Sequence, residues 1–246
     1  MTLRTTIATP AGKQRFVRRI FATIADRYDL ITVVLSYGRD RTWKDRLVAL
    51  AAINGEDRVL DLACGTGDIL FLAARTSRIA VGLDVTFRML QLAAGKRSLL
   101  PPRAGGAKVN AALVTGDMLA LPFPAAHFTV VTTGYGLRNV PDLEKAIDEI
   151  ARVLVPGGRL LSLDFNRPAQ PLLRAAYLAY LTIVGSALGF VLHRDPDTYR
   201  YIPESIRNYP GAEGVARLLE KRGFEQVRVV PLLGGLMAIH VARRAA

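Results

Sequence analysis

The stretch FEQVRVVPLLGGLMAIHVAR, residues 224–243, contains two apolar, strand-like runs that are separated only by Gly234 and Gly235. Two residues are too few for the crossover that joins parallel strands, so these runs predict an antiparallel hairpin. Upstream, from about residue 57, strand and helix patterns alternate along the chain. Such alternation predicts a parallel sheet with helices on both faces. The end of the chain therefore decides the fold, because it requires a parallel sheet that is completed by an antiparallel hairpin.

The alternating region supplies the predicted strands that precede the hairpin and bring the sheet to seven strands. They are expected in RVLDLA (58–63), IAVGLDV (79–85), AKVNAALVTGD (107–117), FTVVTTG (128–134) and GRLLSLDF (158–165). Helices are expected from the glycine loop toward Ala74, over about 87–99 and over 142–154, where Pro156-Gly157-Gly158 stops the last one. This Rossmann-like α/β plan, mostly parallel with a terminal hairpin, is typical of class I S-adenosylmethionine (SAM) methyltransferases and not of nicotinamide dehydrogenases.

The composition limits the class of protein. Half of the 246 residues are apolar, which is enough for a sizeable core. The formal net charge of +12 implies an anionic partner, such as nucleic acid, acidic lipid headgroups or an acidic ligand. The single cysteine, Cys64, excludes an intramolecular disulfide and suits a reducing compartment, so we expect a cytoplasmic protein. His127, His193 and His240 lack neighbours at metal-ligand spacing, so no metal site is predicted.

The N-terminal segment is basic and amphipathic. KQRFVRRIFATIADRYDL (13–30) is expected to form one helix, whose common apolar face is made by Phe16, Ile20 and Ile24. We therefore expect two parts of the chain, a basic helical cap over residues 1–50 and a methyltransferase domain over residues 51–246.

The uncharged run AAYLAYLTIVGSALGFVL, residues 175–192, barely reaches the length of a membrane span. The strand before it and the hairpin after it belong to one predicted sheet, which argues against spanning. We expect a helix within a lid insertion at about 168–205 that covers an acceptor pocket, and an ordinary buried helix stays open as the alternative. Beside a basic cap, such a lid suits peripheral contact with an anionic membrane, and its apolar surface equally suits a homo-oligomer.

The loop CGTGD follows the first predicted strand and indicates a nucleoside site. Gly65 and Gly67 let a ligand approach the backbone, while Leu70 stands where a dinucleotide fingerprint needs a third glycine. Asp84 ends the second strand, where a carboxylate can accept both ribose hydroxyls. Asp117-Met118 ends the third strand, with the carboxylate placed for an adenine amino group and the thioether for the adenine face.

Four segments resemble those of the ubiquinone/menaquinone biosynthesis C-methyltransferases: FATIADRYDL (21–30), SYGRDRTWK (36–44), GLRNV (136–140) and YRYIPESI (199–206). The likeness runs from about Phe16 to Arg244, and it implies SAM as methyl donor and S-adenosylhomocysteine as product. The cofactor-binding residues that follow from the residue patterns and the resemblance are Asp61, Gly65, Thr66, Gly67, Asp84, Val85, Asp117, Met118 and Gly134.

The resemblance implies methyl transfer to a ring carbon of a reduced prenylated quinone precursor, either demethylmenaquinol or 2-methoxy-6-polyprenyl-benzoquinol. The ring becomes nucleophilic when an adjacent phenol, which titrates near ~10, loses its proton. Arg138 is a poor base because a guanidinium stays protonated, but it can hold the developing phenolate, and Asn139 can orient it. Asp164 and Tyr28 are the candidate proton acceptors or relays. The residues expected to line the quinone pocket are Tyr199 and Tyr201.

Other interpretations stay open. Arg138 also suits a structural salt bridge with Asp142 or Glu144 at the following helix start. This chain departs from the family pattern in two places. It has Thr32-Val33 where the family usually has Asn-Asp or Asn-Arg, and it has Asp40 where the family usually has His. These departures leave as alternatives a methyltransferase of another lipophilic molecule, such as a lipid amine or a secondary metabolite, and a binding protein without turnover. Nucleic acid is not expected as a partner, because the sequence lacks a dense Lys/Arg region with stacking aromatics.

Overall fold

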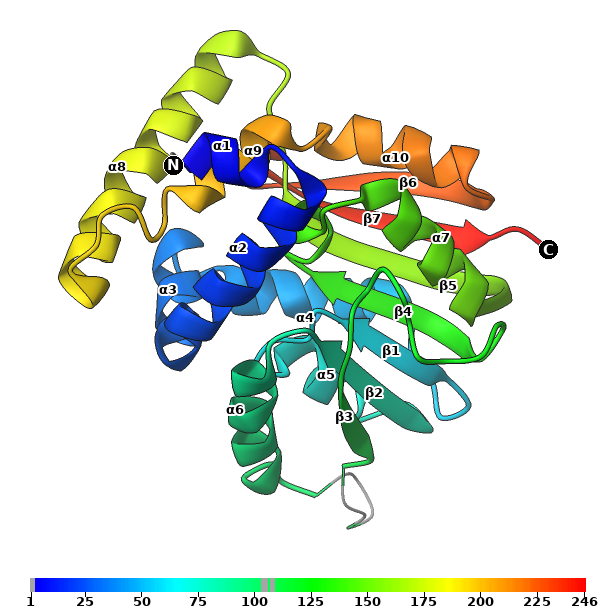
Figure 1. Ribbon diagram of the computed structural model, residues 1–246. Coiled ribbons are helices and arrows are strands. Elements are labelled where there is room, and N and C mark those ends of the chain that lie inside the picture. Colours follow the sequence, from blue (N-terminus) through cyan, green and yellow to red (C-terminus); the bar gives the residue numbers. More distant parts are fainter. Residues whose placement is uncertain (1–2, 103–105, 107–108) are drawn as a thin grey trace.

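The computed structural model describes residues 3–102, 106 and 109–246, and it confirms the predicted fold class. Seven strands form a sheet in the order β3-β2-β1-β4-β5-β7-β6 (Figure 1). These strands are β1 (Arg58–Leu62), β2 (Ile79–Asp84), β3 (Ala111–Thr115), β4 (Phe128–Gly134), β5 (Leu154–Phe165), β6 (Phe224–Leu232) and β7 (Met237–Arg244). β7 pairs antiparallel with β5 and β6, and the other pairs are parallel. The strand order reverses between β1 and β4, and ligands of such sheets bind outside the carboxyl ends at this point.

Helices cover both faces of the sheet. One face packs against α7 (Leu143–Val153) and α10 (Gly211–Lys221), whose apolar residues join one core cluster. The other face packs against α4 (Asp40–Ala51), α5 (Asp68–Ala73) and α6 (Phe87–Ser98), which contribute to a second cluster. The sheet is therefore buried on both sides, which explains the continuous apolar runs of its central strands.

α7 shows how the sequence sets the local structure. Asp142 caps it, because the side chain accepts a backbone N–H of the first turn at 3.0 Å. Four apolar residues of α7 recur at helical spacing and are fully buried, namely Ala146, Ile147, Ile150 and Val153. The helix ends at Val153, because Leu154 already pairs with Phe128 of β4. The expectation that Pro156-Gly157-Gly158 stops this helix was therefore wrong, since these residues lie inside β5 at a shift of register.

Two other predicted bounds were wrong in detail. β3 covers Ala111–Thr115 instead of 107–117, so Asp117 lies in the loop after the strand, and residues 107 and 108 lie outside the described part of the chain. The hairpin connection is longer than Gly234-Gly235, because Leu233–Gly235 form a 3-10 turn. The two glycines have φ angles of 63° and 90°, a left-handed backbone that glycine adopts at no steric cost.

The N-terminal helices lie across the edge of the sheet at which the parallel strands end (Figure 1). α1 (Leu3–Ile7) and α2 (Pro10–Ile24) are followed by a 3-10 turn over Ala25–Arg27 and by α3 (Tyr28–Leu35). The single helix predicted over 13–30 was therefore wrong. The turn lets buried side chains of both α2 and α3 pack into one apolar cluster with α8 (Pro171–His193).

α8 (Pro171–His193) is the helix predicted from the uncharged run, and α9 (Tyr201–Asn208) follows it. α8 is long and apolar enough to cross a membrane, but β5 before it and β7 after it pair directly with each other. Both ends of the insertion therefore return to one sheet. Only 28% of the most apolar window of α8 is buried, so it is not an ordinary core helix. In Figure 1 it projects beyond the sheet. Ile183 and Phe190 are among its exposed side chains.

Candidate active site

Neighbouring cavities open at the carboxyl ends of the parallel strands. The strand-end cavity, about 740 Å³ with its mouth, lies between α2 and the loops that follow β2, β3 and β4. The glycine-loop cavity, about 310 Å³, lies beside the loop after β1. The helical cavity, about 750 Å³, is enclosed mainly by α2, α3 and the residues around the start of α9. Tyr28 and Tyr135 line all of these cavities, so the contents of the cavities would meet at these two rings.

The glycine loop is held against the end of β2. The Gly65 N–H donates to Asp84 Oδ2 at 2.9 Å, and the Thr86 N–H donates to Oδ1 at 2.8 Å. Burial raises the pKa of Asp84, although these hydrogen bonds favour the ionised carboxylate. Gly67 has φ of 90°, and a Cβ at this position would lie 2.4 Å from the Phe71 ring, so the turn requires glycine.

Asp61 lies buried in β1 below this loop and lines the glycine-loop cavity. Its Oδ1 accepts the Thr132 hydroxyl at 2.8 Å, whereas Oδ2 has no hydrogen-bond partner among the described residues. Burial raises the pKa of Asp61 to about 7. Thr66 lines the same cavity, where its hydroxyl donates to Asp29 at 2.7 Å and accepts from Lys96 at 2.9 Å. The wall of this cavity thus contains a buried carboxylate oxygen that can accept a further hydrogen bond.

The strand-end cavity gathers the predicted residues of the later strands. The predicted residues that line it are Gly65, Asp84, Val85, Asp117, Met118 and Gly134. Asp117 faces α2, because its Oδ2 accepts from the Gln14 amide at 2.7 Å and from the Arg18 guanidinium at 3.2 Å. Residues from strands and loops that are far apart in the sequence therefore converge here, and α2 covers them.

Lys13 fixes α2 over this cavity, and no sequence pattern pointed to this role. Its ammonium donates to the carbonyl oxygens of Arg138 at 2.9 Å and Val140 at 2.7 Å. Burial, followed by the nearby Arg138 charge, lowers the pKa of Lys13 to about 8. The covering helix and the backbone beside Arg138 are thus tied by one side chain.

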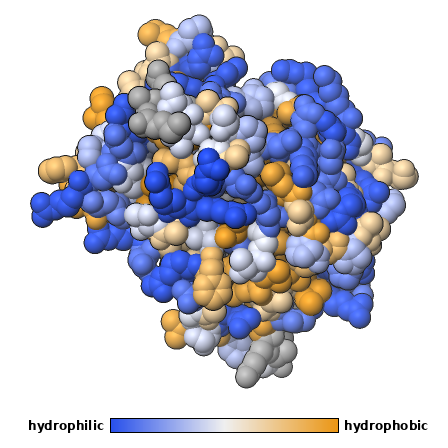
Figure 2. Space-filling view, viewed as in Figure 1, coloured by the Kyte–Doolittle hydropathy of each residue, from blue (hydrophilic) through white to orange (hydrophobic). Residues whose placement is uncertain are grey.

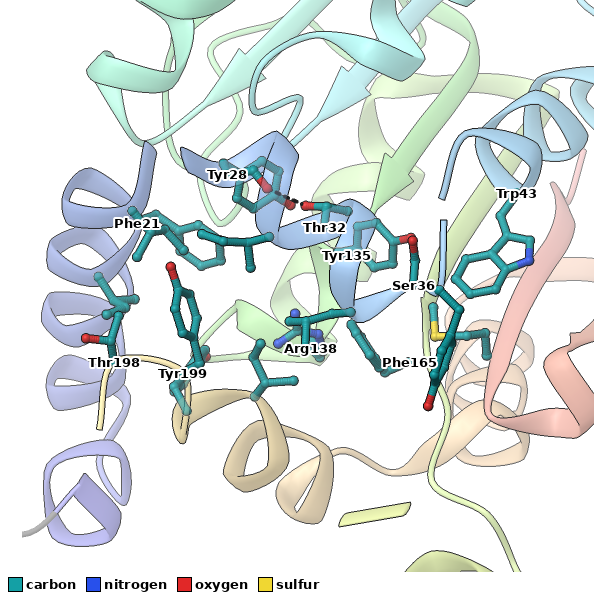
Figure 3. A pocket seen from close by; sticks show the side chains of 18 of the residues that line it. Phe21, Tyr28, Thr32, Ser36, Trp43, Tyr135, Arg138, Phe165, Thr198 and Tyr199 are labelled. Carbon is teal, nitrogen blue, oxygen red and sulfur yellow. Dashed lines mark hydrogen bonds between the residues drawn. The ribbon is translucent and has the colours of Figure 1, made fainter. Parts of the chain in front are cut away.

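Arg138 lies buried in the turn after β4, at the wall of the helical cavity. Its Nε lies 3.0 Å from Asp164 Oδ1, and its backbone N–H donates to Asp164 Oδ2 at 3.1 Å. One guanidinium nitrogen, Nη1, donates to Ser205 Oγ at 2.9 Å and to Asn139 Oδ1 at 3.1 Å. The guanidinium also stands 4.8 Å from the centre of the Phe165 ring. In Figure 3 it lies between Tyr199 and Phe165 in the wall of the cavity.

The salt bridges considered from the sequence for Arg138 do not form. Asp142 caps α7, and Glu144 pairs with Arg222 on the surface, so the carboxylate partner of Arg138 is Asp164. Asp164 is buried behind Arg138, and burial raises its pKa while Arg138 opposes the shift. Its two oxygens accept from the backbone N–H groups of Arg138 and Phe165. Both oxygens are therefore committed to holding the arginine and the strand end.

The predicted tyrosines line the helical cavity. Burial raises the pKa of Tyr28 to about 12, so its phenol keeps its proton at neutral pH. The Tyr199 hydroxyl lies 2.8 Å from His193 Nε2, whereas the buried Tyr201 hydroxyl has no partner among the described residues. Much of the remaining wall is aromatic or aliphatic, and it includes Trp43 and Phe165, which the sequence did not single out as site residues. An apolar ring with an oxygen at one edge would suit this combination of walls and guanidinium.

Asn139 and the residues that depart from the family pattern lie at the edges of the same region. Asn139 lines the strand-end cavity and donates to the Tyr135 carbonyl at 2.7 Å. Thr32 lines the helical cavity, Val33 is half exposed, and Asp40 is buried beneath Tyr135. Within the described ranges, no group of three or more His, Cys, Asp and Glu residues is arranged to hold a metal ion.

Comparison with known proteins agrees with this geometry. The model of the ubiE/COQ5 methyltransferase family matches residues 8–244. The Ubiquinone/menaquinone biosynthesis C-methyltransferase UbiE of Proteus mirabilis is 38% identical over 93% of this chain and 90% of its own length. The protein of the same name from Azotobacter vinelandii is 38% identical over 93% of this chain and 89% of its own.

Solved structures show the same fold. A SAM-dependent methyltransferase from Thermotoga maritima superposes with a TM-score of 0.63 at 17% identity, and the match covers 93% of this chain and 99% of that one. A SAM-dependent methyltransferase from Aquifex aeolicus gives a TM-score of 0.56 at 16% identity, covering 81% and 88%. The fold, the family model and the close relatives lead to one conclusion: this chain belongs to the ubiE/COQ5 methyltransferase family and is a SAM-dependent methyltransferase.

Proposed function

We propose that this enzyme methylates a ring carbon of a reduced, prenylated quinone precursor, either a demethylmenaquinol or a 2-methoxy-6-polyprenyl-benzoquinol. The observation that carries this proposal is the meeting of a nucleoside-sized cavity and an apolar cavity at Tyr28 and Tyr135, with Arg138 at the wall of the apolar one. The names of the relatives from Proteus mirabilis and Azotobacter vinelandii support the same acceptor class.

The donor set around the strand ends fits SAM. The unpartnered Oδ2 of Asp61 suits the ammonium of the methionine part, beside Thr66 in the glycine-loop cavity. Asp84 would accept the ribose hydroxyls, and Asp117 with Met118 would contact the adenine. When bound, SAM supplies an electrophilic methyl group on its sulfonium. The remaining cofactor-site residues, Val85 and the glycines, would shape the walls.

Arg138 would stabilise the acceptor when it becomes an anion. A free phenol titrates near ~10, so a neighbouring guanidinium in a water-poor cavity favours its ionised form. Asp164, Ser205 and Asn139 fix the guanidinium in place, and preorganised donors of this kind are the main source of catalysis by electrostatic stabilisation. We therefore assign Asp164 and Asn139 to positioning. Tyr28 would pack beside the ring as a neutral phenol.

The helices around the acceptor would act as a cap and a lid. Within residues 1–50, α1, α2 and α3 would form the basic helical cap, whereas α4 packs against the sheet. The insertion at about 168–205 would form the apolar lid of the methyltransferase domain 51–246. Figure 2 shows apolar side chains along the margin where α8 lies, next to strongly hydrophilic residues. Exposed Ile183, Phe190 and Val191 beside exposed Arg194 suit peripheral contact of a cytoplasmic enzyme with an anionic membrane, where a prenylated acceptor resides. The same apolar face is the candidate surface for a homo-oligomer.

Mass spectrometry of a methyl-transfer assay tests the reaction. Purified protein and SAM would be offered reduced demethylmenaquinone and the reduced demethyl-ubiquinone precursor in detergent micelles. A product that is heavier by one methyl group on the ring supports the proposal, and the preferred acceptor identifies the pathway. If SAM binds but neither quinol is methylated, the quinol assignment is wrong, and assays of lipid amines and other lipophilic acceptors follow.

A further inference from the structure

Tyr135 is held in a strained position at the junction of the cavities. Its φ of 61° is unusual for a residue with a bulky side chain. Its N–H donates to the Leu163 carbonyl at 2.7 Å, and its own carbonyl accepts from Asn139 at 2.7 Å. Its hydroxyl donates to Asp40 Oδ1 at 2.6 Å. Three hydrogen bonds thus fix where this phenol lies, and in Figure 3 its hydroxyl is turned toward Ser36 in the wall of the helical cavity.

A chain of charged groups runs from the Tyr135 hydroxyl to the outside of the molecule. Asp40 Oδ2 lies 2.5 Å from Lys44 Nζ, and Lys44 Nζ lies 2.8 Å from Asp68 Oδ2. Asp68 Oδ1 in turn lies 3.0 Å from Lys96 Nζ. The side chains of Asp40 and Lys44 are each 8% exposed, whereas those of Asp68 and Lys96 are 38% and 35% exposed. The chain therefore begins at the acceptor cavity and ends in solvent.

A purely structural role explains only part of this arrangement. Asp68 is available to neutralise the buried Lys44, because Lys96 has a second carboxylate partner in Asp29 at 2.6 Å, so Asp40 is not needed as a counter-ion. Arg138, by contrast, pairs with Asp164, which ends in the core and offers no path to solvent. Asp40 differs from Asp164 in its contacts. It accepts a hydrogen bond from the Tyr135 hydroxyl in the cavity wall, and it also contacts Lys44, the next group of the chain toward solvent.

We propose that Asp40, acting through the Tyr135 hydroxyl, receives the proton that the acceptor hydroxyl loses. This inference rests on the proposed function. The acceptor proton moves to Tyr135 Oη while the proton of Tyr135 moves to Asp40 Oδ1, which leaves an acceptor phenolate, a neutral tyrosine and a neutral Asp40. Asp40 then passes its proton to Lys44 while Lys44 passes one to Asp68, and Asp68 releases it to water. Tyr135 is the group that would touch the acceptor, and Asp40 is a positioning and relay residue.

The surroundings of the relay agree with this sequence of transfers. Burial and the neighbouring Asp40 carboxylate raise the pKa of Tyr135, so it passes a proton without resting as an anion. Tyr28 of α3 and Asp164 of β5 also face Tyr135, and Lys44 Nζ lies 5.9 Å from its ring centre. Burial disfavours the ionised form of Asp68, but Lys44 and then Lys96 (α6) outweigh it and lower its pKa.

The test compares Asp40→Asn and Tyr135→Phe with the wild type and with Tyr209→Phe. Tyr209 is the matched control, because it is a buried tyrosine that does not line the three cavities, and its hydroxyl has no hydrogen-bond partner among the described residues. Both relay variants should lower kcat by about 10²-fold at pH 7, the usual contribution of a positioned base, with an unchanged KM for SAM. Their kcat should then rise by about tenfold per pH unit toward pH 9, as hydroxide replaces the base, while the wild type and Tyr209→Phe stay nearly flat.

A loss of kcat that is equal at every pH, or no loss, would overturn the relay. Thermal unfolding separates a folding defect from the expected effect, since Lys44 keeps Asp68 as partner in Asp40→Asn. A second readout does not depend on methyl transfer: the absorbance of bound 6-nitro-2-naphthol, whose anion absorbs visible light, reports ionisation of a phenol in the cavity. The bound probe should ionise at lower pH in the wild type than in both relay variants.

These two readouts distinguish the hypotheses. If the wild type methylates no quinol but the probe titration shifts in the relay variants, the proposed function is wrong and the relay stands for another phenolic acceptor. If the wild type methylates a quinol and neither the pH profile nor the probe titration changes in the variants, the relay alone is wrong.

Discussion

The strand-end cavity and the helical cavity meet at the same two tyrosines, but they are built in different ways. The strand-end cavity is formed largely by loops that follow successive parallel strands between Asp61 and Val140. The helical cavity is assembled from the N-terminal helices and from segments that lie beyond Phe165. A sheet fixes the ends of its strands directly, whereas helices reach their places through side-chain packing. We therefore expect substitutions at the strand ends, in the strand-end and glycine-loop cavities, to alter the affinity for SAM and the stability of the fold. Substitutions in the wall of the helical cavity should instead alter turnover.

The largest effect is expected for Arg138→Lys, which keeps the charge but loses the planar set of donors. Lysine cannot contact Asp164, Ser205 and Asn139 while facing the acceptor, so kcat should fall by about 10³-fold, as for loss of a preorganised donor. The dissociation constant for SAM should change by less than about threefold. Single-turnover kinetics and calorimetric SAM titration measure both. Near-wild-type turnover with an unchanged pH dependence would remove Arg138 from the mechanism.

Asp61→Asn should change the dependence of stability on pH. The pKa of Asp61 in the folded protein is raised to about 7 from 3.8, so the unfolded chain releases this proton at lower pH. The free energy of unfolding of the wild type therefore falls as pH rises from about 4 to about 7, by about 4 kcal/mol through this group, and then levels off.

Asparagine cannot ionise, so the free energy of unfolding of the variant does not fall in this way. Relative to the wild type, the variant should therefore become more stable as pH rises from about 4 to about 7. Urea unfolding without SAM at pH 4.5, 6 and 8 measures it. If the free energies of unfolding of the variant and the wild type change with pH in the same way, burial does not raise the pKa of Asp61 in the folded protein.

Asp84→Asn should weaken SAM binding by about 10-fold, because an amide is a poorer acceptor for two hydroxyls than a carboxylate and charged hydrogen bonds contribute about 1.5–3 kcal/mol. The KM for the quinol should not change, which sharpens the distinction between the cavities. Asp26→Asn is the control, since Asp26 is an exposed carboxylate that pairs with Arg88. Equal SAM affinity in both variants would exclude Asp84 from the cofactor contact.

The smallest effect is expected on the outer face of the lid. The double variant Ile183→Glu with Phe190→Glu should reduce binding to vesicles that contain anionic lipid by about fivefold, through loss of apolar burial and added repulsion. Leu99→Glu is the control, because Leu99 is exposed but lies at the end of α6, away from α8. Vesicle flotation measures both, and equal binding of the double variant and the wild type would exclude α8 as the docking face.

The sequence correctly predicted that residues at the ends of the parallel strands lie together, and the reason is physical. Asp84 ends a strand and Asp117 follows one, and neighbouring parallel strands bring such residues together without knowledge of any other contact. The hairpin was equally readable, because a short connection leaves only antiparallel pairing.

The helical cavity was less predictable because the residues in contact there are far apart in the sequence. Lys13 reaches a carbonyl 125 residues away, Asp40 contacts a tyrosine 95 residues away, and Ser205 contacts Arg138 across 67 residues. No local pattern encodes these pairs, since each depends on how helices pack after the sheet has formed. The same reason explains why the break between α2 and α3 was missed: packing of both helices on α8 overrides a continuous amphipathic pattern.

The two hydrogen bonds of Lys13 couple two parts of the molecule. α2 covers the strand-end cavity, and its lysine holds the backbone of Arg138 and Val140. A displacement of α2 from these carbonyl oxygens would break both bonds and remove this support from the turn that carries Arg138. The position of the helix over one cavity and the position of the guanidinium in the wall of the other therefore depend on the same ammonium.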